Sequence, residues 1–185
     1  MKRFKFYKQL DKMDCGPTCL KMIAKHYGEV YSVEFLRDRS SISNQGVTLF
    51  GLSRAAENIG IRTLNARVPF EKLDSLILPF IAHWKGNHFV VVYKITDRFI
   101  YIADPAIGKI KLSHKEFIEG WGLKEYREEG NVLILEPSPL FYNNSINKKR
   151  DEISSFDSIL YFLQYLRPHK VLLIQISLGL IVGTT

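Results

Sequence analysis

Cysteine is scarce in this chain of 185 residues, in which only Cys15 and Cys19 occur. The N-terminus, MKRFKFYKQLDK, lacks the apolar core of a secretory signal peptide, so we expect a reducing, cytosolic setting. A disulfide between positions four residues apart on one helix is geometrically awkward. A metal site would need two more ligands, and the five histidines form no obvious cluster with the cysteines. The sequence therefore predicts neither a metal nor another cofactor.

Other features are missing as well. The chain has no internal repeat and no low-complexity run, and the phosphate-binding pattern G-x-x-x-x-G-K-[ST] occurs nowhere. The net charge of +7 is spread along the sequence, without an arginine-rich stripe or a platform of aromatic side chains. ATP binding and nucleic-acid binding are therefore not expected of this chain.

No apolar run is long enough to cross a bilayer, which needs about 20 residues. The longest, residues 171–183, has 13 residues without a charge and follows the basic segment RPHK. It fits either a core helix packed on the domain or the start of a transmembrane helix cut short by the chain end. We favour the second because so apolar an uncapped end is hard to explain otherwise, and the positive-inside rule would then place the preceding residues in the cytoplasm.

Proline and glycine residues mark boundaries that divide the chain into three parts. Residues 1–137 form the main domain, residues 138–154 a polar and basic linker, and residues 155–185 an amphipathic helix with the start of a truncated first transmembrane helix. In the main domain, helices are expected at 15–27, 33–38, 48–59 and after Ser113, and strands at 61–68, 78–84, 88–95, 99–103 and 131–136. This order predicts an α+β fold, with N-terminal helices packed on a mostly antiparallel sheet.

Cys15 opens the first predicted helix. Asp14 can cap this helix, Gly16 allows close approach of the backbone, and Pro17 suits a first turn. The positive end of the helix dipole favours a thiolate at this position. Cys19 lies one turn deeper, where a small core residue is expected. Position alone thus favours Cys15 as a nucleophile, although a buried and inert thiol is the commoner occurrence near a helix start.

A catalytic thiolate needs a base and a group that orients the base. His88 begins a hydrophobic strand, and Asp104 ends the next one. A tight turn at 96–98 joins the two strands, so an antiparallel hairpin brings these side chains together. Taken singly, His88 could be an ordinary turn histidine and Asp104 a turn-forming Asp-Pro, and His83 is a rival base. Their joint arrangement with Cys15 favours chemistry.

Gln9 supplies a fourth element. A side-chain amide shortly before a nucleophile can join the backbone N–H of Cys15 in an oxyanion hole, which stabilises the tetrahedral intermediate of acyl transfer. On its own, a glutamine in a surface loop carries no such meaning.

These motifs together resemble the C39 peptidase family, the papain-like domains at the N-terminus of bacteriocin-processing ABC transporters. The resemblance covers about residues 5–137 and rests on QLDKMDCGPTCLKMIAKHYG, on the stretch 39–61, on LPFIAHW and on HFVVVY followed by D-P. It implies a papain-like cysteine protease fold, with Cys15 as nucleophile, His88 as general base and acid, Asp104 as the orienting carboxylate and Gln9 as oxyanion donor.

The resemblance also implies a substrate and partners. The substrate would be a peptide precursor whose leader is cleaved after a Gly-Gly pair, and the partners would be transporter membrane and ATP-binding domains that this chain lacks. The site of action would be the cytoplasmic face of the bacterial inner membrane, reached through the C-terminal segment. Candidates for a groove that holds the leader lie on the helix 48–59 and around Trp84, where core packing is the simpler interpretation.

Two other functions fit the same residues. Related transporter domains that bind the leader without cleaving it are one alternative, although all four site residues are present here. The second is another papain-like acyl-transfer enzyme, such as a transferase or an isopeptidase.

Overall fold

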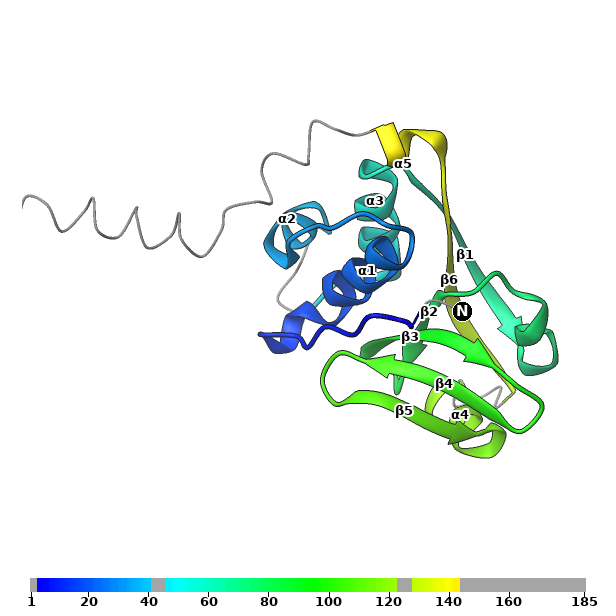
Figure 1. The fold of residues 1–185 in the computed structure, drawn as a ribbon. Coiled ribbons are helices and arrows are strands. Elements are labelled where there is room, and N and C mark those ends of the chain that lie inside the picture. Colours follow the sequence, from blue (N-terminus) through cyan, green and yellow to red (C-terminus); the bar gives the residue numbers. More distant parts are fainter. Residues whose placement is uncertain (1–2, 41–45, 123–127, 144–185) are drawn as a thin grey trace, which may run out of the picture. The chain divides into compact units, whose positions relative to one another are not determined.

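The computed structural model describes residues 3–40, 46–122 and 128–143, which belong to one compact unit, Met1–Ile146. Figure 1 shows an antiparallel sheet with helices on both of its faces. The α+β prediction is confirmed. The helices are η1 (Lys12–Asp14), α1 (Cys15–His26), α2 (Val33–Arg39), α3 (Leu49–Asn58), η2 (Phe70–Ser75), α4 (His114–Trp121) and α5 (Pro139–Asn143).

The described strands pair in the order β1-β6-β2-β3-β4-β5, and every pair is antiparallel. The last strand in sequence, β6, thus lies between β1 and β2. Their bounds are β1 (Ile61–Pro69), β2 (Phe80–Trp84), β3 (His88–Ile95), β4 (Phe99–Asp104), β5 (Gly108–Ser113) and β6 (Glu129–Pro137).

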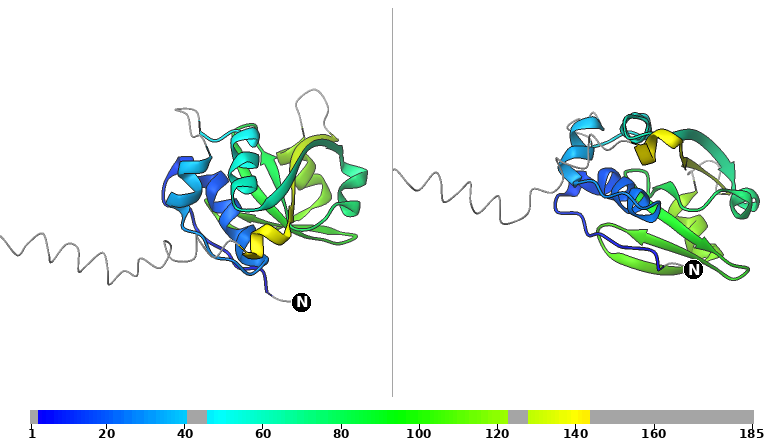
Figure 2. Two further views of the ribbon diagram at one scale, coloured as in Figure 1. Left: turned by 90° about the horizontal axis from the view of Figure 1, so that it is seen from above. Right: turned by 45° about the horizontal axis from the view of Figure 1, so that its top comes forward.

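Helices cover both faces of the sheet (Figures 1 and 2), and a hydrophobic cluster lies on each face. The side covered by α1, α2 and α3, here called the α1 face, includes Phe89 and Val91. The opposite side, covered by α4 and η2 and here called the α4 face, includes Val90 and Val92. Successive side chains of a strand point to opposite faces, so the continuous apolar run of β3 is explained by burial on both sides.

Helix starts follow the sequence signals. The Thr48 hydroxyl accepts a hydrogen bond from the Gly51 N–H at 3.0 Å, and the Ser32 hydroxyl accepts one from the Phe35 N–H at 3.1 Å. Ser113 and Glu116 form a capping box at the start of α4, the helix predicted after Ser113. Local rules of this kind depend on residues three or four apart, which explains why the sequence predicts them well.

Strand β5 was not predicted. It is an edge strand that pairs with β4 along its whole length, and lysines alternate with Ile110 and Leu112. Charged side chains on an edge strand discourage pairing with another chain, but they also hide the strand in a sequence.

Residues 138–143, the start of the predicted linker, pack on the domain. The Ser138 hydroxyl donates to the Gly60 carbonyl at 2.6 Å, and Phe141 in α5 is 1% exposed. The rest of the predicted linker and the predicted amphipathic and transmembrane segments, 155–185, lie outside the described residues. Among residues 3–40, 46–122 and 128–143, none of the helices has the length and apolar character needed to cross a bilayer.

Candidate active site

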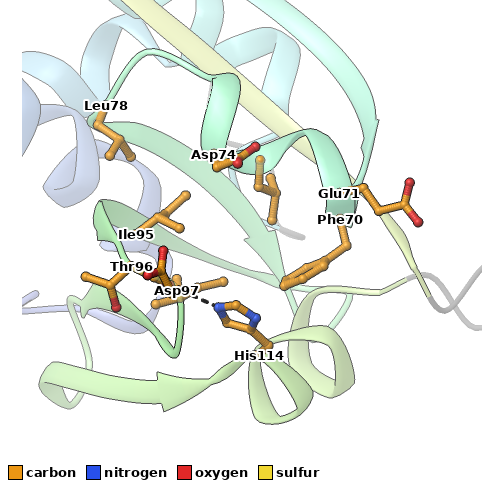
Figure 3. A pocket seen from close by; sticks show the side chains of 10 residues that line it. Phe70, Glu71, Asp74, Leu78, Ile95, Thr96, Asp97 and His114 are labelled. Carbon is orange, nitrogen blue, oxygen red and sulfur yellow. Dashed lines mark hydrogen bonds between the residues drawn. The ribbon is translucent and has the colours of Figure 1, made fainter.

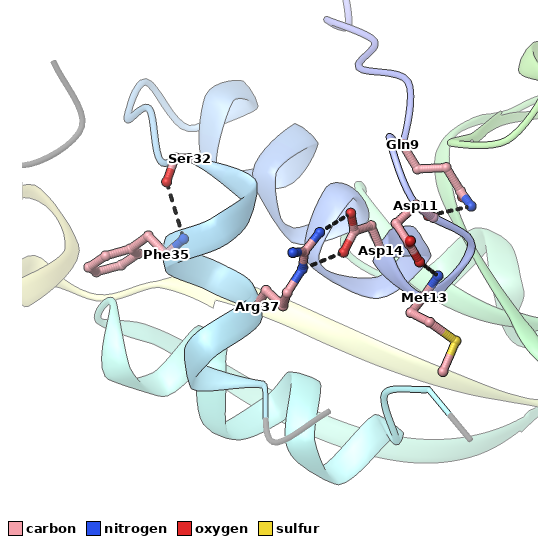
Figure 4. A network of polar contacts seen from close by, with 7 residues as sticks. All are labelled: Gln9, Asp11, Met13, Asp14, Ser32, Phe35 and Arg37. Carbon is pink, nitrogen blue, oxygen red and sulfur yellow. Dashed lines mark hydrogen bonds and ion pairs between the residues drawn. The ribbon is translucent and has the colours of Figure 1, made fainter. Parts of the chain in front are cut away.

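Cys15 is the first residue of α1, directly after η1, and is 6% exposed. Gly16 lies against Val47 and Leu52, because a Cβ at Gly16 would be 3.4 Å and 3.5 Å from their side chains. The missing side chain therefore serves close packing of the helix start. The predicted cap by Asp14 is wrong: its side chain accepts no capping hydrogen bond and instead pairs with Arg37 (Figure 4).

His88 and Asp104 meet as the hairpin predicted. The His88 Nε2 lies 2.8 Å from the Asp104 Oδ1, with Asp104 3% exposed. The same Oδ1 accepts a hydrogen bond from the backbone N–H of Ala106 at 2.8 Å. Two contacts on one oxygen hold the carboxylate at the end of β4, so it can fix the plane and tautomer of the imidazole.

The electrostatics of the pair favour charge on both groups. Burial lowers the pKa of His88, but hydrogen bonds with Asp104 and Cys15 raise it, and the resulting pKa is about 9. Burial raises the pKa of Asp104, but the hydrogen bonds from His88 and Ala106 lower it below its usual value. Because Nε2 faces Asp104, the other ring nitrogen, Nδ1, is left for Cys15. This arrangement suits nucleophilic acyl transfer, in which an imidazole takes the proton of a thiol.

Gln9 lies beside the turn that follows Asp104. Its backbone N–H donates to the Pro105 carbonyl at 2.9 Å, and its side-chain Nε2 donates to the Asp11 carbonyl at 3.0 Å. The Oε1 is buried and has no hydrogen-bond partner within the described part of the chain. The structure thus brings Gln9 to the Asp104 end of the site.

The segment that carries Gln9 is anchored to the sheet further upstream. The Phe4 ring stacks on Tyr93 with centroids 4.8 Å apart, and the Lys109 ammonium donates to the Phe4 carbonyl. These contacts join residues far apart in the sequence, so periodicity could not predict them.

Cys19 lies in the core, as predicted. It is fully buried, and its thiol donates a weak hydrogen bond to the Phe89 carbonyl at 3.4 Å. Burial, followed by the charges of Cys15 and Asp104, raises its pKa well above the ordinary value. A thiol in this state is a poor nucleophile.

Trp84, one candidate for lining the leader groove, is 6% exposed and packs inside the core, in agreement with the simpler interpretation. Its ring lies 5.4 Å from the Phe117 ring and directly over Gly120. One pocket, of about 250 Å³, lies between η2, α4 and the turn that joins β3 to β4 (Figure 3). There His114 Nε2 donates to the Thr96 carbonyl at 3.1 Å. His88 and Asp104 lie at the opposite end of that hairpin, so this pocket is separate from the candidate active site.

A second groove, of about 360 Å³, runs over β1, β6 and the end of η2. Leu64 and Ile77, which line it, are 60% and 50% exposed. Exposed apolar side chains beside a groove are typical of surfaces that contact another chain.

As for metals, no three His, Cys, Asp or Glu side chains gather as ligands in the described ranges.

Arg37 is the residue near the site that sequence reasoning missed. Its Nε donates to the Asp14 Oδ1 at 2.7 Å, and its Nη2 pairs with the Asp14 Oδ2. The available signal was indirect: an aspartate predicted at a buried helix start needs a partner, because buried charges are rarely left unpaired. Nothing in the sequence identified which of the many cations would be that partner.

Sequence comparison finds relatives among peptide-processing transport proteins. The chain is 35% identical to the lactococcin-G-processing and transport ATP-binding protein LagD of Lactococcus lactis subsp. lactis, over 82% of this chain and 21% of LagD. It is also 35% identical to the transport/processing ATP-binding protein ComA of Streptococcus pneumoniae, over 71% of this chain and 18% of ComA. The chain thus spans about a fifth of the length of these relatives.

Solved structures share the fold. The peptidase domain of Streptococcus ComA matches with a TM-score of 0.65 and 32% identity, over 74% of this chain and all of that domain. A double glycine motif protease from an AMS/PCAT transporter, solved in complex with the leader peptide, matches with a TM-score of 0.67 and 29% identity, over 74% of this chain and 93% of that one. Residues 3–138 match the peptidase C39 family, and with the fold and these relatives this establishes that the chain belongs to the C39 peptidases.

Proposed function

We propose that this chain is a cysteine endopeptidase that removes the leader of a bacteriocin-like peptide precursor after a Gly-Gly pair. The observation that carries the proposal is the 2.8 Å contact between His88 Nε2 and Asp104 Oδ1, made beside Cys15 at the start of α1. Three side chains from separate elements converge there in the order that nucleophile, base and orienting carboxylate require.

In the first half of the reaction, His88 takes the Cys15 proton and the thiolate attacks the carbonyl carbon of the scissile peptide bond. The carbonyl oxygen becomes an oxyanion in the tetrahedral intermediate. The imidazolium of His88, stabilised by Asp104, then gives its proton to the leaving amine. The C–N bond breaks, and the leader stays attached to Cys15 as a thioester.

In the second half, water replaces the amine. His88 accepts a proton from the water molecule as its oxygen attacks the thioester carbonyl. The second tetrahedral intermediate collapses, the C–S bond breaks, and the proton returns to the Cys15 sulfur. The leader is released with a free carboxylate, and the enzyme is restored.

Gln9 is the proposed oxyanion donor, together with the backbone N–H of Cys15. One N–H of the Gln9 amide is engaged by the Asp11 carbonyl, and an amide nitrogen carries two hydrogens. The second N–H is therefore available to an oxyanion. Removing one donor of this kind typically costs about 100- to 1000-fold in rate.

The substrate class follows from the relatives and from the surface. A related protease with the same fold was solved with a leader peptide, and the curated relatives are named for peptide processing and transport. The groove at Leu64 and Ile77 offers apolar contacts for an amphipathic leader. Membrane and ATP-binding domains of an ABC transporter are the proposed partners, and the cytoplasmic face of the bacterial inner membrane is the proposed location, reached through the C-terminal segment.

Mass spectrometry of synthetic precursors tests the proposal. We expect the protein to cut a leader peptide after Gly-Gly, and to cut a peptide shortened to the residues around Gly-Gly with a higher KM. Cys15→Ala should abolish cleavage. Cys19→Ala, the matched control four residues away, should keep kcat within about threefold, because Cys19 only fills the core. Full activity of Cys15→Ala would refute the assignment.

The same assay separates the alternatives. A binding module would hold the leader peptide without producing fragments, and its Cys15→Ala variant would bind equally well. Another acyl-transfer enzyme would leave the Gly-Gly bond intact but act on an unrelated amide. The complete set of Cys15, His88, Asp104 and Gln9 favours proteolysis over both.

A further inference from the structure

A buried ion pair lies directly beside the proposed nucleophile. Asp14, the residue before Cys15, has a fully buried side chain, and both of its carboxylate oxygens contact the Arg37 guanidinium. Figure 4 shows Arg37 reaching from α2 to the start of α1 in this two-pronged contact. The Arg37 side chain is 39% exposed, so the pair runs from the protein surface to the buried residue that precedes Cys15.

Local helix capping does not account for Asp14. Asp11 accepts the hydrogen bond from the Met13 N–H at 2.8 Å and so caps η1, while Ser32 caps α2. The Asp14 side chain makes no cap hydrogen bond. Its recorded hydrogen bonds are those to Arg37, a residue of a different helix.

The charge of Asp14 would oppose the chemistry if it stood alone. A carboxylate next to Cys15 disfavours a second negative charge on the Cys15 sulfur, and weak screening in a buried site makes this effect large. A guanidinium that contacts both oxygens cancels most of that field. The fork geometry also fixes the direction of the Asp14 side chain, which an ammonium group would do less well.

We propose that the Asp14–Arg37 pair is a positioning device for Cys15: Arg37 neutralises Asp14 and clamps the first turn of α1, so that the thiolate forms and faces His88. This inference rests on the proposed function, since it takes Cys15 as the nucleophile. Neither residue touches the reacting atoms in this scheme. Both act through Cys15.

Several other charges must be considered in a pH experiment. His88 from β3, Asp104 from β4 and the Cys19 thiol of α1 interact with the Cys15 region, and Asp11 and Glu34 act on Arg37. All of them are unchanged in variants of Asp14 and Arg37. A shift that reverses between these two variants therefore reports the pair itself.

The test measures alkylation of Cys15 by iodoacetamide against pH, with the modified residue identified by peptide mapping. In Arg37→Gln, the unpaired Asp14 charge should move the rise of the alkylation rate to higher pH by about one unit. In Asp14→Asn, the remaining charge of Arg37 should move the rise of the alkylation rate to lower pH. The double variant should return close to wild type, because both charges are then absent.

Cleavage kinetics give a second readout. At neutral pH, Arg37→Gln should lose about 10- to 100-fold in kcat with KM within about threefold, and part of the loss should be recovered at higher pH. Arg37→Lys should have the pH profile of the wild type but not its full kcat, because lysine supplies the positive charge without the two-pronged contact to Asp14. Arg39→Gln is the matched control: Arg39 is on the same helix, where it stacks on Phe35 at 3.5 Å, and its loss should leave both readouts unchanged.

Shifts in the same direction for both single variants, or no shift in either, would overturn the proposal. If thermal melting shows that Arg37→Gln does not fold, the alkylation profiles of Asp14→Asn and of the double variant still test the proposal. Alkylation needs no peptide cleavage. A wild-type protein that fails to cut the leader peptide therefore refutes the proposed function. The opposite shifts of the alkylation profiles in the two single variants test the role of the ion pair separately.

Discussion

The two faces of the sheet are built for different purposes. On the α1 face, α1, α2 and α3 or their caps contribute four buried polar side chains, Asp14, Thr18, Ser40 and Ser53. On the α4 face, neither α4 nor η2 contributes a buried polar side chain among the described residues, and Phe117 and Trp121 pack against Trp84 and its apolar neighbours. Both faces exclude water, but among the described helices only those of the α1 face bury a charged side chain, that of Asp14 at the start of α1.

This contrast separates chemistry from support. Buried charges are costly unless paired, so Asp14 on the helix side needs Arg37, and Asp104 at the end of β4 needs His88. The α4 face needs only volume and shape. Changes to the paired charges should therefore alter rate constants, whereas changes to the buried apolar side chains of the α4 face should alter the free energy of unfolding.

The largest effect is expected at Asp104. Asp104→Ala removes the acceptor for His88 Nε2 and for the Ala106 N–H, so kcat should fall about 100- to 10,000-fold. Asp104→Asn keeps an oxygen that can accept both hydrogen bonds but loses the charge, so it should retain more activity than the alanine variant. Cleavage of the leader peptide under saturating conditions measures both. Equal activities of the two variants would show that orientation of His88 contributes nothing beyond charge.

The next effect links the His88–Asp104 pair to pH. Because the pKa of His88 is raised from 6.5 to about 9, the folded protein binds a proton that the unfolded chain releases between these values. This contribution to stability is fully present below about pH 6.5 and is lost as pH rises to about 9, by about 3 kcal/mol at most. Urea denaturation from pH 6 to 9.5 should show the decline in the wild type and a weaker decline in His88→Gln.

His83 provides the control for that experiment. Burial lowers the pKa of His83. Its contribution to the pH dependence of stability therefore lies in the acidic range, below pH 6.5. His83→Gln should therefore leave the decline between pH 6.5 and 9 unchanged. An identical response of the two histidine variants would contradict the assignment of this decline to His88.

The smallest effect is expected on the α4 face, at Gly120. A Cβ at this position would lie 2.8 Å from Cε2 of Trp84 and closer still to Cζ2 and Cη2. Gly120→Ala should destabilise the protein by about 1 to 2 kcal/mol, with kcat unchanged at temperatures where the protein is folded. Thermal and urea unfolding measure the cost.

Trp84→Phe tests whether this cost is steric. Phenylalanine lacks the part of the indole ring that Gly120 contacts, so the cost of Gly120→Ala should shrink in the Trp84→Phe background. A change of kcat in Gly120→Ala would contradict the contrast between the two faces, because it would show that packing on the α4 face affects the reaction.

Much of the fold followed from local rules in the sequence. The starts of α2, α3 and α4 were visible in Ser32, Thr48 and Ser113, and five of the strands were recognisable from β-branched and aromatic runs. The sixth, β5, was hidden because its lysines match an edge strand only once the neighbouring strand is known. The segment 138–143 was taken for a linker because nothing local shows that Phe141 is buried in the domain.

The candidate site divides in the same way. The His88–Asp104 contact could be predicted because a short hairpin fixes which residues of its two strands face each other. Trp84 was a candidate for the leader groove, yet only packing against Phe117 and Gly120 shows that it belongs to the core.

By itself the sequence determined that the two cysteines differ, that Cys15 begins a helix, and that a histidine and an aspartate meet across a hairpin. These features depend on residues that are close in the chain or joined by one tight turn. Only the tertiary structure decided which cation pairs with Asp14, where Gln9 is anchored, and which face of the sheet carries the buried charge. Such choices join distant segments, and burial selects them because a charge removed from water is costly unless the fold brings a partner to it.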